Sequence, residues 1–278
     1  MLGKLLKQEL KVTSRYFIPM YVSFIVVTLL LKLSFFFSGG NEALFVNGTS
    51  ALADFFQGLM IFLYVIVLVG INILTYFFII KRFYSNLFGD EGYLMFTLPV
   101  SAGQLIGSKL ISALIWLMIM VPMNLLSFVL LFVGTDAYRS FTYYASYFTE
   151  ELHILSISGY HIGLLVFEII VIAILSLLCS LLMFYFSIAL AQHFFNEHRL
   201  LGTIGCYFVL SMIQSMIESF GGIFTNDIFT NILMSSNPVQ LFSGIQMALP
   251  FTMIIYILLI VAYYIGTHFL IQKKLNLY

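Results

Sequence analysis

Three ionisable side chains stand inside long apolar stretches of this sequence: Lys32, Glu168 and Glu218. A charge in hydrocarbon is costly, so an ionisable residue in a membrane segment indicates a functional site by default. Lys32 could pair with either glutamate if they lie at similar depth, or each side chain could reach the bilayer surface along its aliphatic stem. The first interpretation is therefore a structural ion pair or surface anchoring. The alternative is an intramembrane polar site that contacts a substrate.

The sequence offers little for catalysis. It contains no His-Glu-x-x-His zinc pair, no Gly-x-Ser-x-Gly elbow and no Gly-x-x-x-x-Gly-Lys-Ser/Thr phosphate loop. Neither Cys179 nor Cys206 has a second Cys or His at ligand spacing, so both are interpreted as small buried side chains. We expect no catalytic residue, no metal site and no cofactor in this chain.

The stretches around these charges predict a membrane protein. Hydrophobic residues make up 62% of the 278 residues, charged residues make up 9%, and the mean hydropathy is +1.06. That leaves too little polar surface to cover a soluble globule. Each stretch can cross a hydrocarbon core of about 30 Å at about 1.5 Å per residue. We expect a single all-α integral membrane domain with six transmembrane helices, at residues 17–37, 56–80, 105–133, 162–190, 200–220 and 251–271.

The basic residues predict how these helices are oriented. If the amino terminus is cytoplasmic, ten of the twelve Lys and Arg residues lie at cytoplasmic ends or loops, and only Lys32 and Arg139 lie on the far half. Basic residues near the ends of spans set orientation, so both termini are predicted to be cytoplasmic. Lys32, Glu168 and Glu218 then fall in the outer half of their helices.

Three further segments have features of the membrane boundary. Leucines recur at helical spacing through residues 1–15 with lysines on the opposing face, which predicts an interfacial helix. The outer connection 134–161 carries five tyrosines, as expected at the headgroup level. Residues 221–250 are apolar but broken by Gly-Gly and Asn-Pro, which favours one or two re-entrant or interfacial outer helices.

The longest predicted cytoplasmic loop, residues 81–104, looks structured. Asp90 and Glu91 precede the apolar run 93–98, where their charges suit a helix amino terminus, and Pro99 would stop that helix. Exposing such a run is unfavourable unless another surface covers it. The run either lies on the membrane or under the helices, or it docks on a cytoplasmic partner.

Small and polar residues predict how the spans begin and pack. Ser101 and Gln104 form a capping box ahead of the third stretch, and Gly103 and Gly107 favour close helix packing at its cytoplasmic end. Three amides inside the stretches are expected to hydrogen bond between helices: Asn72, Asn124 and Gln214.

The order of these elements resembles the permease subunit of an ABC-2 type, or type V, ABC transporter. In layout the resemblance covers the whole chain. In sequence it rests mainly on residues 90–109, with Glu-Gly-Tyr at 91–93, Thr-Leu-Pro-Val-Ser at 97–101 and Gln-Leu-x-x-x-Lys at 104–109. The chain is similar to Gram-positive permeases that export phenol-soluble modulins or bacteriocins.

The resemblance implies roles for three segments. Residues 1–15 would be the connecting helix, 221–250 the outer re-entrant helices, and 89–98 a coupling helix that inserts into a groove on a separate ATPase subunit. That ATPase would bind ATP and Mg²⁺. The residues implied in coupling are Asp90, Glu91, Tyr93, Leu94 and Phe96.

The same resemblance implies partners and a location. The chain would work in a bacterial plasma membrane with a second permease copy or paralogue, surrounded by lipid and without nucleic acid. The cargo would be an amphipathic or antimicrobial peptide moved out of the cell or membrane.

Two other functions remain open from the sequence. An ion-coupled secondary transporter usually carries ionisable groups near the midplane and broken helices in repeated halves, whereas these three charges are off-centre. A non-transporting immunity or sensory subunit could have much the same sequence.

Overall fold

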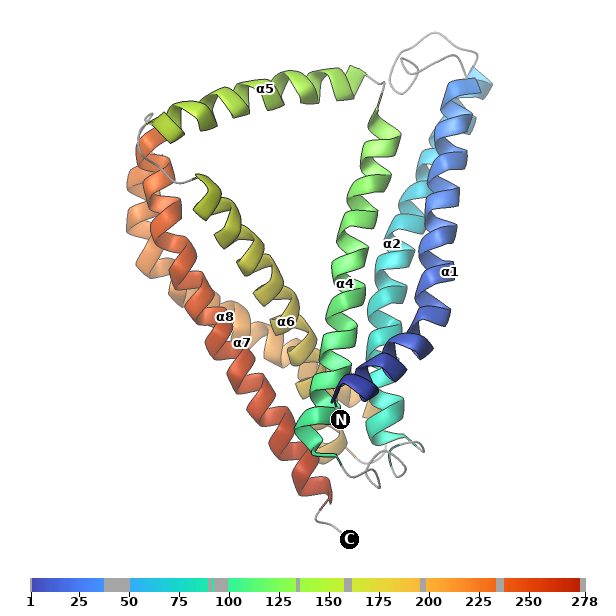
Figure 1. Ribbon diagram of the computed structural model, residues 1–278, viewed down its shortest axis with the longest axis vertical. Helices are drawn as coiled ribbons and strands as arrows, with labels where there is room; N and C mark the ends of the chain where they lie inside the picture. The colour runs from blue at the N-terminus through green and yellow to red at the C-terminus, as the bar shows by residue number, and fades with distance from the viewer. Residues whose placement is uncertain are drawn as a thin grey trace. The chain divides into compact units, whose positions relative to one another are not determined.

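The computed structural model describes residues 2–37, 51–89, 92, 100–133, 136–157, 162–195, 199–233 and 238–275. The regular structure in these residues is helical, and they contain no strand. Figure 1 shows the helices, which are α1 (Leu2–Phe37), α2 (Ala51–Phe88), α4 (Ala102–Phe132), α5 (Asp136–Ile157), α6 (Ile162–Phe194), α7 (Arg199–Leu233) and α8 (Pro238–Leu275).

Six of these helices are long and apolar enough to cross a membrane. The predicted all-helical class and the six candidate spans are therefore confirmed. The orientation and the cytoplasmic termini stay predictions. The candidate spans are Leu2–Ser34, Gly58–Phe88, Ala102–Phe132, Ile162–Phe194, Arg199–Gly221 and Gly244–Gln272.

The helix boundaries differ from the sequence prediction at both ends of the chain. Residues 1–15 were expected to form their own interfacial helix, but α1 runs unbroken from Leu2 to Phe37. Its first turns, dark blue in Figure 1, are inclined to the rest of the helix. Residues 221–233 continue α7 and residues 238–250 begin α8. Their re-entrant placement stays a prediction.

Helix α5 was not foreseen. It occupies most of the connection 134–161, for which the sequence predicted only an aromatic segment at the outer membrane boundary. Within it, the hydroxyls of Tyr143 and Tyr147 are 3.0 Å apart and their ring centroids 4.9 Å apart, one helical turn along. Helical spacing of these tyrosines was the signal available in the sequence.

The helices form two compact units. We call the first the α1 unit, which comprises Gly3–Ile79 and Ile111–Glu151, and the second the α6 unit, which comprises Met1–Leu2, Ile80–Leu110 and Leu152–Tyr278. Helices α2 and α4 each contribute one end to the α6 unit and the remainder to the α1 unit.

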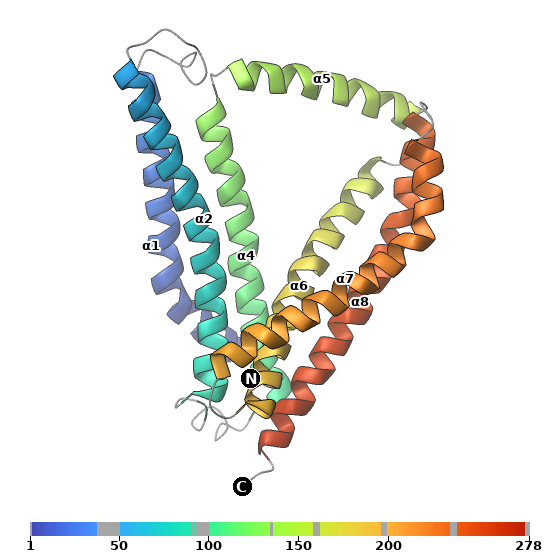
Figure 2. The same cartoon turned by 180° about the vertical axis from the view of Figure 1, so that it is seen from behind.

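In the α1 unit, α1, α2 and α4 lie side by side (Figure 1 and Figure 2). Aromatic side chains join α1 to α4: the Phe17 and Trp116 rings stack with centroids 4.8 Å apart. Trp116 Nε1 donates to Thr13 Oγ1 at 2.8 Å, and the Tyr21 hydroxyl donates to the Trp116 carbonyl at 3.2 Å. Since a buried indole N–H needs an acceptor, these bonds satisfy Trp116 while fixing its ring.

In the α6 unit, the second half of α6 is the centre of the packing. Its side chains from Cys179 to Gln192 are mostly buried, and α7 and α8 pack against it. Tyr185 of α6 stacks on Phe83 at the end of α2, with ring centroids 3.7 Å apart and planes 4° apart. Gly266 of α8 leaves room for the ring of Phe186, because an added Cβ would lie 2.5 Å from it.

Candidate functional site

A polar cluster joins three membrane helices of the α6 unit around Gln214 of α7. The Tyr263 hydroxyl of α8 donates to Gln214 Oε1 at 3.3 Å, and the Cys179 thiol of α6 donates to the same oxygen at 3.7 Å. Gln214 Nε2 in turn donates to Glu218 Oε1 at 2.9 Å. Only the amide oxygen can accept from a hydroxyl, and only the nitrogen can donate to a carboxylate, so these partners determine how the amide is oriented.

The cluster runs from a buried end to an exposed end. Cys179 is fully buried and Tyr263 is 6% exposed, whereas Glu218 is an exposed side chain. Every donor in the chain of hydrogen bonds points toward the Glu218 carboxylate. The arrangement therefore holds a carboxylate at the surface of a membrane-spanning helix and ties it to the helices behind it.

The cluster confirms part of the sequence analysis and adds to it. Gln214 was expected to hydrogen bond between helices, and it does. Cys179 is buried as predicted, and its thiol also hydrogen bonds. Tyr263 was missed because a tyrosine in an apolar stretch gives no signal of its own. Asn72 and Asn124 were also expected to hydrogen bond between helices, and they bond to each other, with Asn124 Nδ2 donating to Asn72 Oδ1 at 3.0 Å.

Glu168 does not take part in these hydrogen bonds. It lies on α6 eleven residues before Cys179, about 16 Å along a helix axis. Its Oε2 atom is buried and has no hydrogen-bond partner in the described part of the chain. Of the three intramembrane charges, only Glu218 belongs to the cluster.

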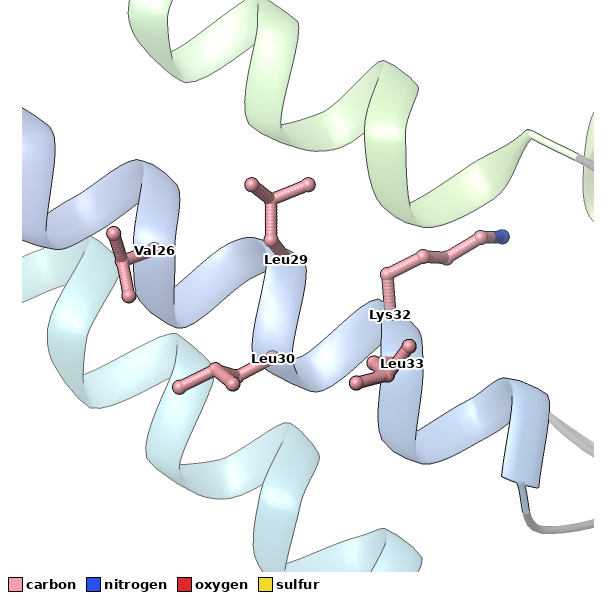
Figure 3. Close-up of a pocket in the computed structure, with 5 residues that line it drawn as sticks. All are labelled: Val26, Leu29, Leu30, Lys32 and Leu33. Carbon is pink, nitrogen blue, oxygen red and sulfur yellow. The ribbon is translucent and has the colours of Figure 1, made fainter.

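Lys32 binds the end of α4 within the α1 unit. Its Nζ donates to the carbonyl oxygen of Leu131 at 3.2 Å and to that of Val133. Figure 3 shows the side chain reaching from α1 toward the end of α4. A cation is stabilised at a helix carboxyl terminus, where unpaired carbonyls carry partial negative charge. The ion pair with Glu168 or Glu218 would join two units and stays a prediction.

A shallow groove of about 470 Å³ lies beside Lys32 on α1. Four aliphatic side chains form its apolar part (Figure 3): Val26, Leu29, Leu30 and Leu33. An aliphatic surface of this kind is common on the lipid-facing side of a membrane helix, so the groove by itself indicates no ligand.

The residues that the resemblance implies in coupling, Asp90, Glu91, Tyr93, Leu94 and Phe96, lie outside the described residues. The helix ends on either side of them are described. After α2, the Gly89 amide donates to the carbonyls of Tyr84 at 3.1 Å and Ser85 at 3.2 Å.

Helix α4 begins at Ala102, directly after Ser101, whose carbonyl and Oγ accept from the Gln104 amide at 3.0 and 3.4 Å. This confirms the predicted start of the third span. Gly103 faces α8, since an added Cβ would lie 3.0 Å from the Tyr264 hydroxyl. The close packing predicted for Gly103 is confirmed.

Comparison with family models, curated proteins and solved structures found no match to this chain. Among the described residues, no group of three His, Cys, Asp or Glu side chains could hold a metal ion. Function must therefore be inferred from the residues themselves.

Proposed function

We propose that this chain is the membrane subunit of an ATP-driven exporter of the ABC-2 type. It would move amphipathic or antimicrobial peptides out of a bacterial cell or its plasma membrane, with a second copy or a related permease beside it. A separate ATPase would bind ATP and Mg²⁺ and supply the energy. The sequence supports this through residues 90–109, and the structure through six helices able to span a membrane.

One structural observation carries the proposal. The ends of α2 and α4 on either side of the coupling residues, Ile80–Leu110, belong to the α6 unit together with α6, α7 and α8. Phe83 stacks on Tyr185 of α6, and Gly103 lies against Tyr264 of α8. A partner that displaces residues 89–101 would therefore move the same packed unit that holds the Gln214 and Glu218 cluster.

Charge reversal in the coupling segment tests the proposal. The chain is co-expressed with a candidate ATPase and purified, and ATP hydrolysis is measured with and without a cationic amphipathic peptide. We expect the double substitution Asp90→Lys and Glu91→Lys to abolish retention of the ATPase and its stimulation, because the docking charges are reversed. Equal retention and stimulation would refute the coupling role.

A matched control is the double substitution Glu150→Lys and Glu151→Lys, which makes the same change of charge in α5. This pair lies on the outer side in the predicted orientation and should leave ATPase binding intact. Loss of binding in the control would show that net charge, and not the coupling segment, governs association.

An ion-coupled secondary transporter is the second candidate, favoured by the buried Oε2 of Glu168 that has no hydrogen-bond partner in the described residues. Ionisable side chains inside membrane segments are typical of ion-coupled transporters. Transport that survives ATP depletion but stops with the proton gradient or with Glu168→Gln would support this candidate. Peptide binding without any transport would instead indicate an immunity or sensory subunit.

A further inference from the structure

Four polar side chains gather on one exposed face of α7. Glu218, Ser215 and Ser219 are exposed and Ser211 is half-buried. Their spacing of three and four residues places them on the same side of the helix. The serines thus form a polar face around the carboxylate at the exposed end of the cluster.

This face offers hydrogen-bond acceptors only. Each serine has one hydroxyl proton, and each donates it to a carbonyl of its own helix. Ser211 donates to Phe208 at 2.8 Å, Ser215 to Met212 at 2.9 Å, and Ser219 to the carbonyl of Ser215 at 2.8 Å. The hydroxyl oxygens therefore retain lone pairs but have no proton left to give.

The donor nearest to the carboxylate is already used. Gln214 Nε2 donates to Glu218 Oε1, while Gln214 Oε1 is occupied by the Tyr263 hydroxyl and the Cys179 thiol. A ligand on this face must consequently supply the donors itself. It must also supply positive charge, since a carboxylate on a membrane helix needs a counter-charge.

Apolar side chains flank the polar face. Phe208 is 65% exposed, Met212 54% and Met216 62%, so large apolar surfaces stand beside the acceptors. Methionine side chains are flexible and adapt to apolar ligands of varied shape. The same surface can therefore hold a charged head and an apolar body.

We propose that the Ser211, Ser215, Glu218 and Ser219 face of α7 binds amphipathic cations whose charge is carried by a donor-rich group, a primary ammonium or a guanidinium. The ammonium or guanidinium donates to Glu218 and to the serine oxygens, and the apolar part lies on Phe208 and the methionines. That such a cation is the cargo rests on the proposed function.

The test uses the full chain alone, without an ATPase, in phosphatidylcholine nanodiscs. The probe is tritiated N-dodecanoyl-lysine amide, with partition into empty nanodiscs subtracted. A second probe carries a trimethylated lysine, which keeps the charge and apolar chain but has no ammonium donor. We expect the primary ammonium to bind at least about tenfold more tightly than the quaternary one, because the charge-assisted hydrogen bonds are lost.

Two charge-removing variants separate the site from general effects. Glu218→Gln should weaken binding of the primary ammonium by about tenfold or more, whereas Glu150→Gln, the same change on α5, should leave it within about twofold. Thermal unfolding followed with a thiol-reactive dye at the free cysteines Cys179 and Cys206 checks that each variant is folded. Equal binding of both probes, or unchanged binding by Glu218→Gln, would overturn the proposal.

A second copy of the chain is the competing occupant of this face. If a second copy covers this face, a cysteine introduced by Ser215→Cys would form a disulfide with the same position of that copy. The second copy would also prevent the probe from binding. That result would also overturn the proposal. Because the probe is tested on the chain alone, failure of an ATPase to associate would refute the proposed function and leave this binding result unaffected.

Discussion

Replacing Gly89 with alanine places a methyl group 2.7 Å from the carbonyl oxygen of Ser85, 3.2 Å from its Cα and 3.3 Å from its carbonyl carbon. These are backbone atoms, so no side-chain rotation can relieve the contact. The last turn of α2 must shift by several tenths of an ångström, at a cost of about 1–3 kcal/mol. The bonds from the Gly89 amide to Tyr84 and Ser85 would be strained with it.

The same substitution at Gly70 is a matched control in the same helix. An alanine Cβ there meets nothing within 4 Å, so the change should stabilise α2 by about 0.5–1 kcal/mol. The two variants should then differ by about 1.5–4 kcal/mol, or about 3–16 °C in Tm at about 2–4 °C per kcal/mol. Thermal unfolding with a thiol-reactive dye measures the difference.

The functional readout separates the end of α2 from the rest of the helix. We expect Gly89→Ala to speed hydrogen exchange in residues 80–89 and, in the proposed complex with an ATPase, to lower peptide-stimulated ATP hydrolysis, while Gly70→Ala leaves both unchanged. If the two variants have the same Tm, exchange and hydrolysis, then the end of α2 tolerates a Cβ and the steric reasoning is wrong.

Three other contacts give measurable predictions. A double-mutant cycle of Phe83→Leu and Tyr185→Leu should show a coupling energy of about 0.5–1.5 kcal/mol from the ring stack, and strictly additive effects would contradict it. Asn124→Leu should lower Tm by about 1–7 °C, since hydrogen bonds between membrane helices contribute about 0.6–1.7 kcal/mol. An unchanged Tm would mean that the bond to Asn72 contributes nothing to stability. Lys32→Met should destabilise the end of α4 by about 0.3–1 kcal/mol, which would be measured as faster hydrogen exchange there. Lys32→Arg should keep the slow exchange, because it retains a cation near the carbonyl oxygens. Equal exchange in both variants would show that the Lys32 ammonium does not stabilise the end of α4.

The helices could be predicted from the sequence because lipid imposes a simple rule on it. A membrane helix must be apolar for about 20 residues, and its few polar side chains need partners on other helices. Both features can be read directly from the sequence, which is why the six candidate spans and the interhelical bonding of Asn72 and Asn124 were expected, although their pairing with each other was not. Helix α5 was not predicted because its polar and aromatic residues are mixed, so it contains no apolar run of about 20 residues.

The partners of charged side chains were harder to predict. For Lys32 the sequence left an ion pair, surface anchoring and a substrate site open, and none of these named the carbonyl oxygens at the end of α4 that its Nζ contacts. Helix ends carry no distinctive residue type, so a sequence search for opposite charges overlooks them as counter-charges. Tyr263 and Cys179 were missed for a related reason: their contacts with Gln214 depend on how α6, α7 and α8 face one another.

Gln214 connects the helices that hold Glu218 to one another, within the unit that also contains residues 80–110. Its amide accepts from α6 and α8 and donates along α7, so a rotation of any one helix changes how Glu218 is held. Helices α6 and α8 are also those that contact the ends of α2 and α4, through Tyr185 and Tyr264. Displacing those ends would alter the hydrogen bond that fixes the exposed carboxylate. The proposed exporter subunit would need such a connection to release a cation when its ATPase binds nucleotide. In that case Gln214→Leu should weaken both ligand binding and its response to nucleotide.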